Sequence, residues 1–190
     1  GILPYRVLLT NAEMALDSAK INKHFVSVND YSKLIEINPN NAVPYFGRAL
    51  DFMLIQDFAS SLDDLNRVIQ LSDNFVLAYF MRAVVRFKQI EYRAFTQDFD
   101  TQNSKSVTEA FSLPKNSASS ILLPNSSSNK KESVGMDYEM VLRDYDKVIE
   151  MSPQFVYAYY NQANVRCAQR DFRAALADYN EAIRLRPDFS

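Results

Sequence analysis

The side chains that most often bind metals or attack substrates are scarce in this sequence of 190 residues. It contains one histidine, His24, and one cysteine, Cys167. A zinc site needs several such ligands, so no metal site is predicted. His24 stands beside Phe25 in a stretch of helical pattern. We expect it to be a half-exposed surface residue rather than a ligand or a general base.

Carboxylates are more common, but their spacing does not indicate a catalytic pair. Asp63 and Asp64, and further along Asp144 and Asp146, are expected to lie on the outer, solvated faces of helices. The sequence also lacks a glycine-rich phosphate loop and a nucleophile elbow. It therefore predicts no catalytic residue and no cofactor, and it does not indicate an enzyme.

The helices that would carry these residues repeat along the chain. The segment Tyr45–Ala49 returns 34 residues later as Tyr79–Ala83, and again as Tyr159–Ala163. A fixed period of this length is typical of helical repeats, each of which must stack on a neighbour to bury its apolar face. We call the helix that contains this motif helix A.

A second helix, helix B, follows in each repeat and opens at Asp57, Asp137 or Asp171. Apolar residues at intervals of three and four form one stripe along each helix B. The stripes consist of Leu62, Leu65, Val68 and Ile69; of Leu142, Tyr145, Val148 and Ile149; and of Leu176, Tyr179, Ala182 and Ile183. Prolines just past helix ends stop the helices, because proline cannot continue the hydrogen-bond ladder. They are Pro39, Pro153 and Pro187.

These positions together resemble the tetratricopeptide repeat family. Residues 156–189 match its pattern best, with Tyr159 at the tryptophan position and Ala163, Ala175, Tyr179, Ala182 and Pro187 at later positions. Residues 42–75 match with Tyr45, Ala49, Phe52, Ser61, Leu65 and Val68. The chain departs from the pattern where Arg48, Arg82 and Gln162 replace a leucine, and where Arg86 and Arg166 replace a late tyrosine. The resemblance implies an all-α fold, a right-handed α-solenoid of antiparallel helix pairs.

The repeats divide the chain into four predicted segments. Residues 1–41 hold an extended segment and a helix that begins at Asp17 as N-cap and ends at Ile37, the remnant of a degenerate repeat. Whether residues 9–21 form a separate helix A is left open. One repeat spans residues 42–75, a second spans 76–152, and a third spans 156–189.

The second repeat is predicted to be split by a serine-rich insertion at about residues 93–135, after a turn at Glu91-Tyr92. Such a composition favours a mobile loop, because it offers little apolar surface to offset the entropy of ordering. The segment also contains two apolar islands, Phe111–Pro114 and Ile121–Pro124. They leave open an alternative, in which this segment docks on the solenoid as an internal ligand. Asn125 begins a glycosylation sequon of the kind that arises by chance in serine-rich segments.

Charge and hydropathy exclude several classes of partner. The net charge is −2 with both signs interspersed, so a nucleic-acid partner is not predicted. No stretch of the sequence reaches the roughly 18 consecutive apolar residues that a helix needs to span a bilayer. The sequence begins with Gly1 and stops where another helix A is expected, so we expect the natural protein to be longer. Whether a leader or membrane anchor preceded Gly1 is left open, and so is the compartment of the protein.

The family resemblance implies that helices A line the concave side of the superhelix and that their exposed faces bind a partner. On this sequence the predicted peptide-binding groove consists of Val43, Phe46, Leu50, Met53, Leu77, Phe80, Val84, Phe87, Tyr157, Tyr160, Asn161 and Asn164, followed by Cys167. Most of these residues are apolar or aromatic, which favours an apolar peptide or helix over a charged chain terminus. Only Asn161 and Asn164 resemble the polar residues of a carboxylate clamp.

The sequence therefore predicts a non-catalytic scaffold that binds a protein or peptide partner. Two other interpretations are left open: the chain is a structural domain whose groove is filled by its own residues, or it is an accessory domain of a larger protein. The last helix B is expected to leave part of its apolar stripe unpaired, which would allow self-association through this end of the chain.

Overall fold

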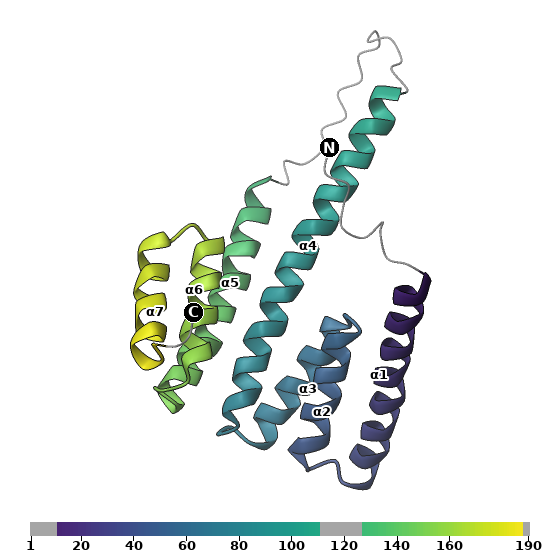
Figure 1. Cartoon of the computed structure of the whole chain (residues 1–190), viewed down its shortest axis with the longest axis vertical. Helices are drawn as coiled ribbons and strands as arrows, with labels where there is room; N and C mark the ends of the chain where they lie inside the picture. The colour runs from purple at the N-terminus through teal and green to yellow at the C-terminus, as the bar shows by residue number, and fades with distance from the viewer. Residues whose placement is uncertain (1–10, 111–126, 188–190) are drawn as a thin grey trace. The chain divides into compact units, whose positions relative to one another are not determined.

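The computed structural model describes the backbone of residues 11–110 and 127–187, and side chains over most of residues 22–96 and 135–187. Within these ranges every regular element is an α-helix, so the predicted all-α class is confirmed. The helices group into two compact units, residues 1–85 and 86–190, which are described separately (Figure 1).

The first unit contains α1 (Asn11–Ile37), α2 (Ala42–Leu54), α3 (Phe58–Leu71) and the start of α4 (Val76–Ala110). Helix α1 packs on α2, and α2 packs on α3 (Figure 1). Helix α2 begins after Asn41 and α3 after Asp57, whose side chains accept hydrogen bonds from the backbone N–H groups of Val43 and Ser60. Such capping satisfies N–H groups that have no partner inside the helix.

The core of this unit forms where small residues let helices approach closely. Ala49 of α2 has no exposed surface and packs with Leu65 and Val68 of α3 and with Ala78 and Val85 of α4. Ser61 takes the small position on α3, and its hydroxyl donates to the Ala49 carbonyl at 2.7 Å. Ala83 and Ala163, which end the recurring motif as Ala49 does, are likewise fully buried.

Gly47 marks a second close approach, between α1 and α2. A Cβ atom placed on Gly47 would lie 2.6 Å from Cε1 and 2.7 Å from the hydroxyl of Tyr31. The tyrosine ring therefore occupies the space that any other residue at this position would need. The motif Tyr45–Ala49 holds glycine here because α1 is the helix packed against it.

The second unit contains the rest of α4, α5 (Ser127–Met151), α6 (Val156–Ala168) and α7 (Phe172–Leu185). Helix α5 packs on α6, and α6 packs on α7. Helix α7 begins after Asp171, whose side chain accepts from the N–H of Ala174, as Asp57 does for α3. The buried hydrophobic side chains of this unit include Val141, Tyr145, Val148, Ala158, Val165, Ala175 and Ala182.

The turn between helix A and helix B depends on one residue with left-handed backbone. Gln56 and Arg170 both have a φ of 65°. The next residue, Asp57 or Asp171, donates its N–H to the carbonyl of Phe52 or Arg166 at 2.9 Å. This is a Schellman-type helix end, which satisfies carbonyls that lack a partner inside the helix.

The predicted turn at Glu91-Tyr92 is wrong, because α4 continues through it to Ala110. Ile90 stands where Gln56 and Arg170 turn the chain, and a β-branched residue is strained at positive φ. Glu91 stands where aspartate would cap the next helix, and glutamate is a poor N-cap. Both turn signals are therefore missing at this point.

The predicted insertion at residues 93–135 is helical over much of its length, since α4 reaches Ala110 and α5 begins at Ser127. Asp137, the expected start of helix B, lies inside α5 and pairs with Arg93 of α4 at 3.2 Å. The two apolar islands, and Asn125 of the sequon, lie outside the described residues.

The first helix also differs from the expectation. It begins at Asn11, not at Asp17, and runs without a turn to Ile37. Residues 9–21 therefore do not form a helix A separated from a helix B, and residues 11–16 are helical rather than extended. The remainder of the predicted extended segment, residues 1–10, lies outside the described residues.

We predict that Ala49→Leu destabilises the protein by about 1–3 kcal/mol, because the larger side chain must displace Leu65 and Val68 from a filled core. Ala59→Leu, at an exposed position of α3, is the matched control and should change stability little. Urea denaturation followed by circular dichroism measures both. Equal stability of the two variants would show that the A–B crossing is not closely packed.

We also predict that Gln56→Gly stabilises the protein by about 0.5–1 kcal/mol, because glycine adopts positive φ without strain from a Cβ atom. Gln56→Ala should give no such gain, since alanine keeps the Cβ. The melting temperatures of the two variants provide the comparison. A gain from alanine equal to that from glycine would contradict the proposed strain.

Candidate functional site

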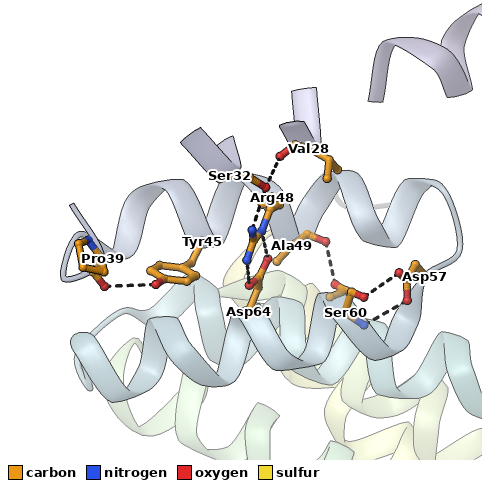
Figure 2. A network of polar contacts seen from close by, with 10 residues as sticks. Val28, Ser32, Pro39, Tyr45, Arg48, Ala49, Asp57, Ser60 and Asp64 are labelled. Carbon is orange, nitrogen blue, oxygen red and sulfur yellow. Dashed lines mark hydrogen bonds and ion pairs between the residues drawn. The ribbon is translucent and has the colours of Figure 1, made fainter. Parts of the chain in front are cut away.

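The surfaces of the helices A are held in place by buried ion pairs between helix A and helix B. Arg48 Nε and Nη2 donate to the two carboxylate oxygens of Asp64 at 2.7 and 2.8 Å (Figure 2). In the second unit, Arg166 Nη1 donates to both oxygens of Asp178 at 2.7 Å. The bidentate contact of Arg48 with Asp64 fixes the orientation of both side chains.

The third pair joins Arg86 of α4 to Asp144 of α5 at 2.6 Å. Asp64, Asp144 and Asp178 are equivalent positions of the repeat, and all three are buried. The expectation that Asp64 and Asp144 lie on solvated faces is therefore wrong. Asp63 and Asp146, by contrast, are exposed as expected.

The arginine comes from one of two positions on helix A. Arg86 and Arg166 are equivalent, and Phe52 takes their place in the repeat of residues 42–75. There, Arg48 reaches the aspartate from one turn earlier, and its guanidinium carbon lies 5.7 Å from the centroid of the Phe52 ring. The departures from the family pattern at these positions thus supply the partners of the buried carboxylates.

Burial and pairing shift the pKa values of these groups in opposite ways. Burial raises the pKa of the Asp178 carboxyl, although the charge and hydrogen bond of Arg166 oppose the shift. In the first unit the hydrogen bond to Asp64 raises the pKa of the Arg48 guanidinium. Both effects follow from removing charges from water and holding them next to each other.

A second set of hydrogen bonds links each helix B to the following helix A. Arg48 Nη1 donates to Ser32 Oγ at 2.9 Å, and Arg82 Nη1 donates to Asn66 Oδ1 at 2.8 Å. In the second unit, Gln162 Nε2 donates to Asp146 Oδ1 at 2.6 Å. The two partners are 16 residues apart in every case.

His24 forms a further polar contact between α1 and α2. Its Nδ1 lies 2.6 Å from Oδ1 of Asp51, a buried carboxylate of α2. The His24 side chain is partly exposed, as expected, but the contact with Asp51 was not predicted. Among the described residues, no cluster of three or more His, Cys, Asp or Glu side chains could hold a metal ion.

The predicted groove residues of the first unit divide into exposed and packed positions. Val43 and Leu77, which are equivalent in the repeat, are 64% and 45% exposed. Phe46 and Met53 are partly buried against the core, and the Phe46 ring centroid lies 5.0 Å from that of Phe75. The partly buried positions also include Leu50, Phe80 and Val84.

In the second unit, Tyr157 and Tyr160 of α6 are the exposed members of the predicted set. The Tyr160 ring packs edge-on against Tyr179 with 5.7 Å between centroids. Asn161 donates to the Tyr157 carbonyl, and Asn164 accepts a hydrogen bond of 2.6 Å from the Tyr179 hydroxyl. Cys167 is partly buried. Phe87 of α4 lies near Tyr138, with 6.3 Å between ring centroids.

The contribution of the Arg48–Asp64 pair to stability can be tested with the neighbouring residue Asp63 as a control. We expect Asp64→Asn to cost about 2 kcal/mol, because the amide leaves the partly buried Arg48 without a carboxylate. Asp63→Asn changes an exposed residue and should stay within about 0.5 kcal/mol of wild type. Urea denaturation distinguishes them, and equal effects would contradict a structural role for the Arg48–Asp64 pair.

Comparison with known proteins connects these repeats to a family. The tetratricopeptide repeat model matches residues 156–189, which hold α6, α7 and the Arg166–Asp178 pair. A search of curated proteins finds no match. None of the helices in the described part of the chain is long and apolar enough to cross a membrane.

Solved structures similar to this chain include the first TPR domain of Spaghetti (RPAP3) bound to the HSP90 peptide SRMEEVD. That match has 17% identity and a TM-score of 0.49 and covers 86% of this chain and 98% of that one. MamA from Desulfovibrio magneticus RS-1 matches at 10% identity and a TM-score of 0.37, over 93% and 95% of the two chains. YrrB, a TPR protein with an unusual peptide-binding site, matches at 16% identity and a TM-score of 0.34, over 90% and 82%. The chain therefore carries a tetratricopeptide repeat at residues 156–189, and the 34-residue period relates this repeat to the helix pairs that precede it.

Proposed function

We propose that this protein is a non-catalytic scaffold that binds an apolar peptide or helix of a partner protein on the exposed faces of its helices A. The observation that carries the proposal is a recurring exposed apolar residue in the first turns of these helices. It is Val43 in α2, Leu77 in α4 and Tyr157 in α6. Exposure of apolar side chains at one repeated position is typical of an interaction surface.

Packed aromatic rings near these residues in the sequence support the proposal. In the first unit, Phe46 rests on Phe75 and on the core, so its ring is held rigidly. In the second unit, Tyr160 rests on Tyr179, and Phe155 lies edge-on to Tyr157 with 6.1 Å between centroids. Rigid aromatic residues bind partners well because little side-chain entropy is lost on contact.

The polar residues of α6 argue against recognition of a charged chain terminus there. A carboxylate clamp needs donors directed outward. The Asn161 amide donates instead to the backbone of its own helix. The favoured ligand is therefore an amphipathic segment with apolar anchors at helical spacing, bound with little dependence on salt.

The experiment is a selection of helical peptides from a display library against the purified protein. We expect the selected peptides to bind the double variant Val43→Ser, Leu77→Ser about tenfold more weakly, because two exposed apolar anchors are lost. The double variant Val26→Ser, Leu34→Ser removes two exposed apolar residues of α1 instead and should bind like wild type. Thermal melting of both variants should match wild type, since all four side chains are exposed.

Three outcomes would contradict the proposal. One is that no peptide is enriched, as expected if the protein's own chain fills the groove. Another is that binding survives the Val43 and Leu77 substitutions. The third is that the acidic peptide SRMEEVD binds with an affinity that falls steeply with salt, because this behaviour indicates a charge clamp.

A further inference from the structure

The junction between α1 and α2 contains a polar pair in a largely buried place. His24 Nδ1 of α1 lies 2.6 Å from Oδ1 of Asp51 in α2, 27 residues further along the chain. The Asp51 side chain is 12% exposed and the His24 side chain 28%. His24 is the one histidine of the sequence. A buried carboxylate at this junction is therefore partnered by a group that can gain or lose a charge.

The later junctions between a helix B and the next helix A are apolar at the same two positions. The equivalent residues, with the same separation, are Phe58 and Val85 at one junction and Tyr138 and Val165 at the other. Phe58 packs against the core cluster that includes Val85. Both valines are fully buried. An ionisable pair thus replaces an aromatic ring and a valine between α1 and α2.

The alignment of the junctions does not depend on this pair. Arg48 donates to Ser32 between α1 and α2 (Figure 2), and Arg82 donates to Asn66 between α3 and α4. These two hydrogen bonds are equivalent, because a shift of 34 residues converts one into the other. The same shift takes the positions of the histidine and the aspartate to those of the phenylalanine and the valine.

The charge of His24 determines how well the pair compensates for the burial of Asp51. A carboxylate removed from water is stabilised more by an adjacent positive charge than by a neutral donor. Imidazole can donate from Nδ1 in both states, but it is positive only when both ring nitrogens carry a proton. Histidine is the side chain that ordinarily changes charge between about pH 5 and 8. A contact between phenylalanine and valine has no group that titrates.

The other charged groups of α1 are directed elsewhere in its described part. Lys23, next to His24 in the sequence, is exposed. Asp30 and Lys33 are exposed and pair with each other at 3.2 Å. The side chains of the charged residues before Asn22 lie outside the described residues.

The helix packed against α1 offers no competing cation to Asp51. Arg48 is the other charged residue of α2, and its guanidinium contacts Asp64 and Ser32. At the start of α3, the Asp57 carboxylate accepts hydrogen bonds from Ser60. Among the described side chains, His24 is therefore the group at this junction that contacts Asp51 and can become positive.

We propose that the α1–α2 junction is a proton-sensitive joint. Protonated His24 holds α1 against Asp51 of α2, and loss of this proton as the pH rises loosens the junction. The α2–α3 pair stays closed, because the core around Ala49 and the Arg48–Asp64 pair do not involve the histidine. The change is a shift in a local opening equilibrium, not unfolding of the domain.

Amide hydrogen exchange of the full chain at about pH 5.5 and about pH 8 tests the joint across the range in which histidine titrates. Opening constants are obtained after correction for the base-catalysed intrinsic rate. We expect the opening constant of α1 amides to be about fivefold to tenfold larger at the higher pH, because the ion pair becomes a pair with a neutral donor. The amides of α3, whose junction has Phe58 and Val85, should show no such change.

Two variants assign the effect to the pair. His24→Asn keeps a donor at the position of Nδ1 but cannot become positive, so its α1 should open equally at both pH values. The double variant His24→Phe, Asp51→Val restores the residue types of the next junction. It should remove the pH dependence and keep α1 at least as protected as in wild type at the lower pH. Lys23→Gln, at the exposed neighbour, is the matched control and should respond like wild type.

Equal opening of wild-type α1 at the two pH values would overturn the proposal. A pH response that persists in His24→Asn would also overturn it, because the response would then belong to another group. So would a parallel change in α3, which would indicate a change in global stability. Circular dichroism checks that each variant is folded, and if the double variant is not, the comparison of wild type with His24→Asn decides. No ligand enters this experiment, so its result is independent of the peptide selection.

Discussion

The buried carboxylate on each helix B is the constraint on which much of this structure depends. A charge removed from water must be paired, and each of Asp64, Asp144 and Asp178 is paired with an arginine of the preceding helix A. The pair fixes the rotation of helix A about its axis, because the arginine must point at helix B. With one side of helix A fixed, the residues Val43, Leu77 and Tyr157 are left on the exposed side.

The repeat and its helix pairs could be predicted because they depend on local and periodic signals. The 34-residue recurrence, the small residue at Ala49 and the aspartates before α3 and α7 all correspond to observed packing or capping. The turn at Glu91 was misplaced because neighbouring repeats suggested it, whereas Ile90 and Glu91 themselves oppose a turn. In this segment local backbone preference outweighed the analogy with the other repeats.

The buried aspartates were missed for a different reason. A polar residue in an amphipathic helix is ordinarily exposed, and nothing adjacent to Asp64 or Asp144 indicates otherwise. The available signal was long-range: an aspartate at one fixed repeat position, and arginines where the family pattern has apolar residues. For the groove, the helical pattern distinguished the faces of each helix but not exposed Val43 from packed Phe46. That difference depends on a contact with Phe75, which precedes α4.

The separations of the paired residues indicate where these repeats tolerate a change in length. The link from each helix B to the next helix A spans 16 residues in all three instances. The arginine–aspartate pair within a repeat spans 12 residues for Arg166 and 58 for Arg86, yet both pairs form. The junction between A and B therefore acts as a site for insertions, whereas the junction between B and the next A acts as a spacer of fixed length. New sequence can be acquired within a repeat without disturbing the stacking between consecutive repeats.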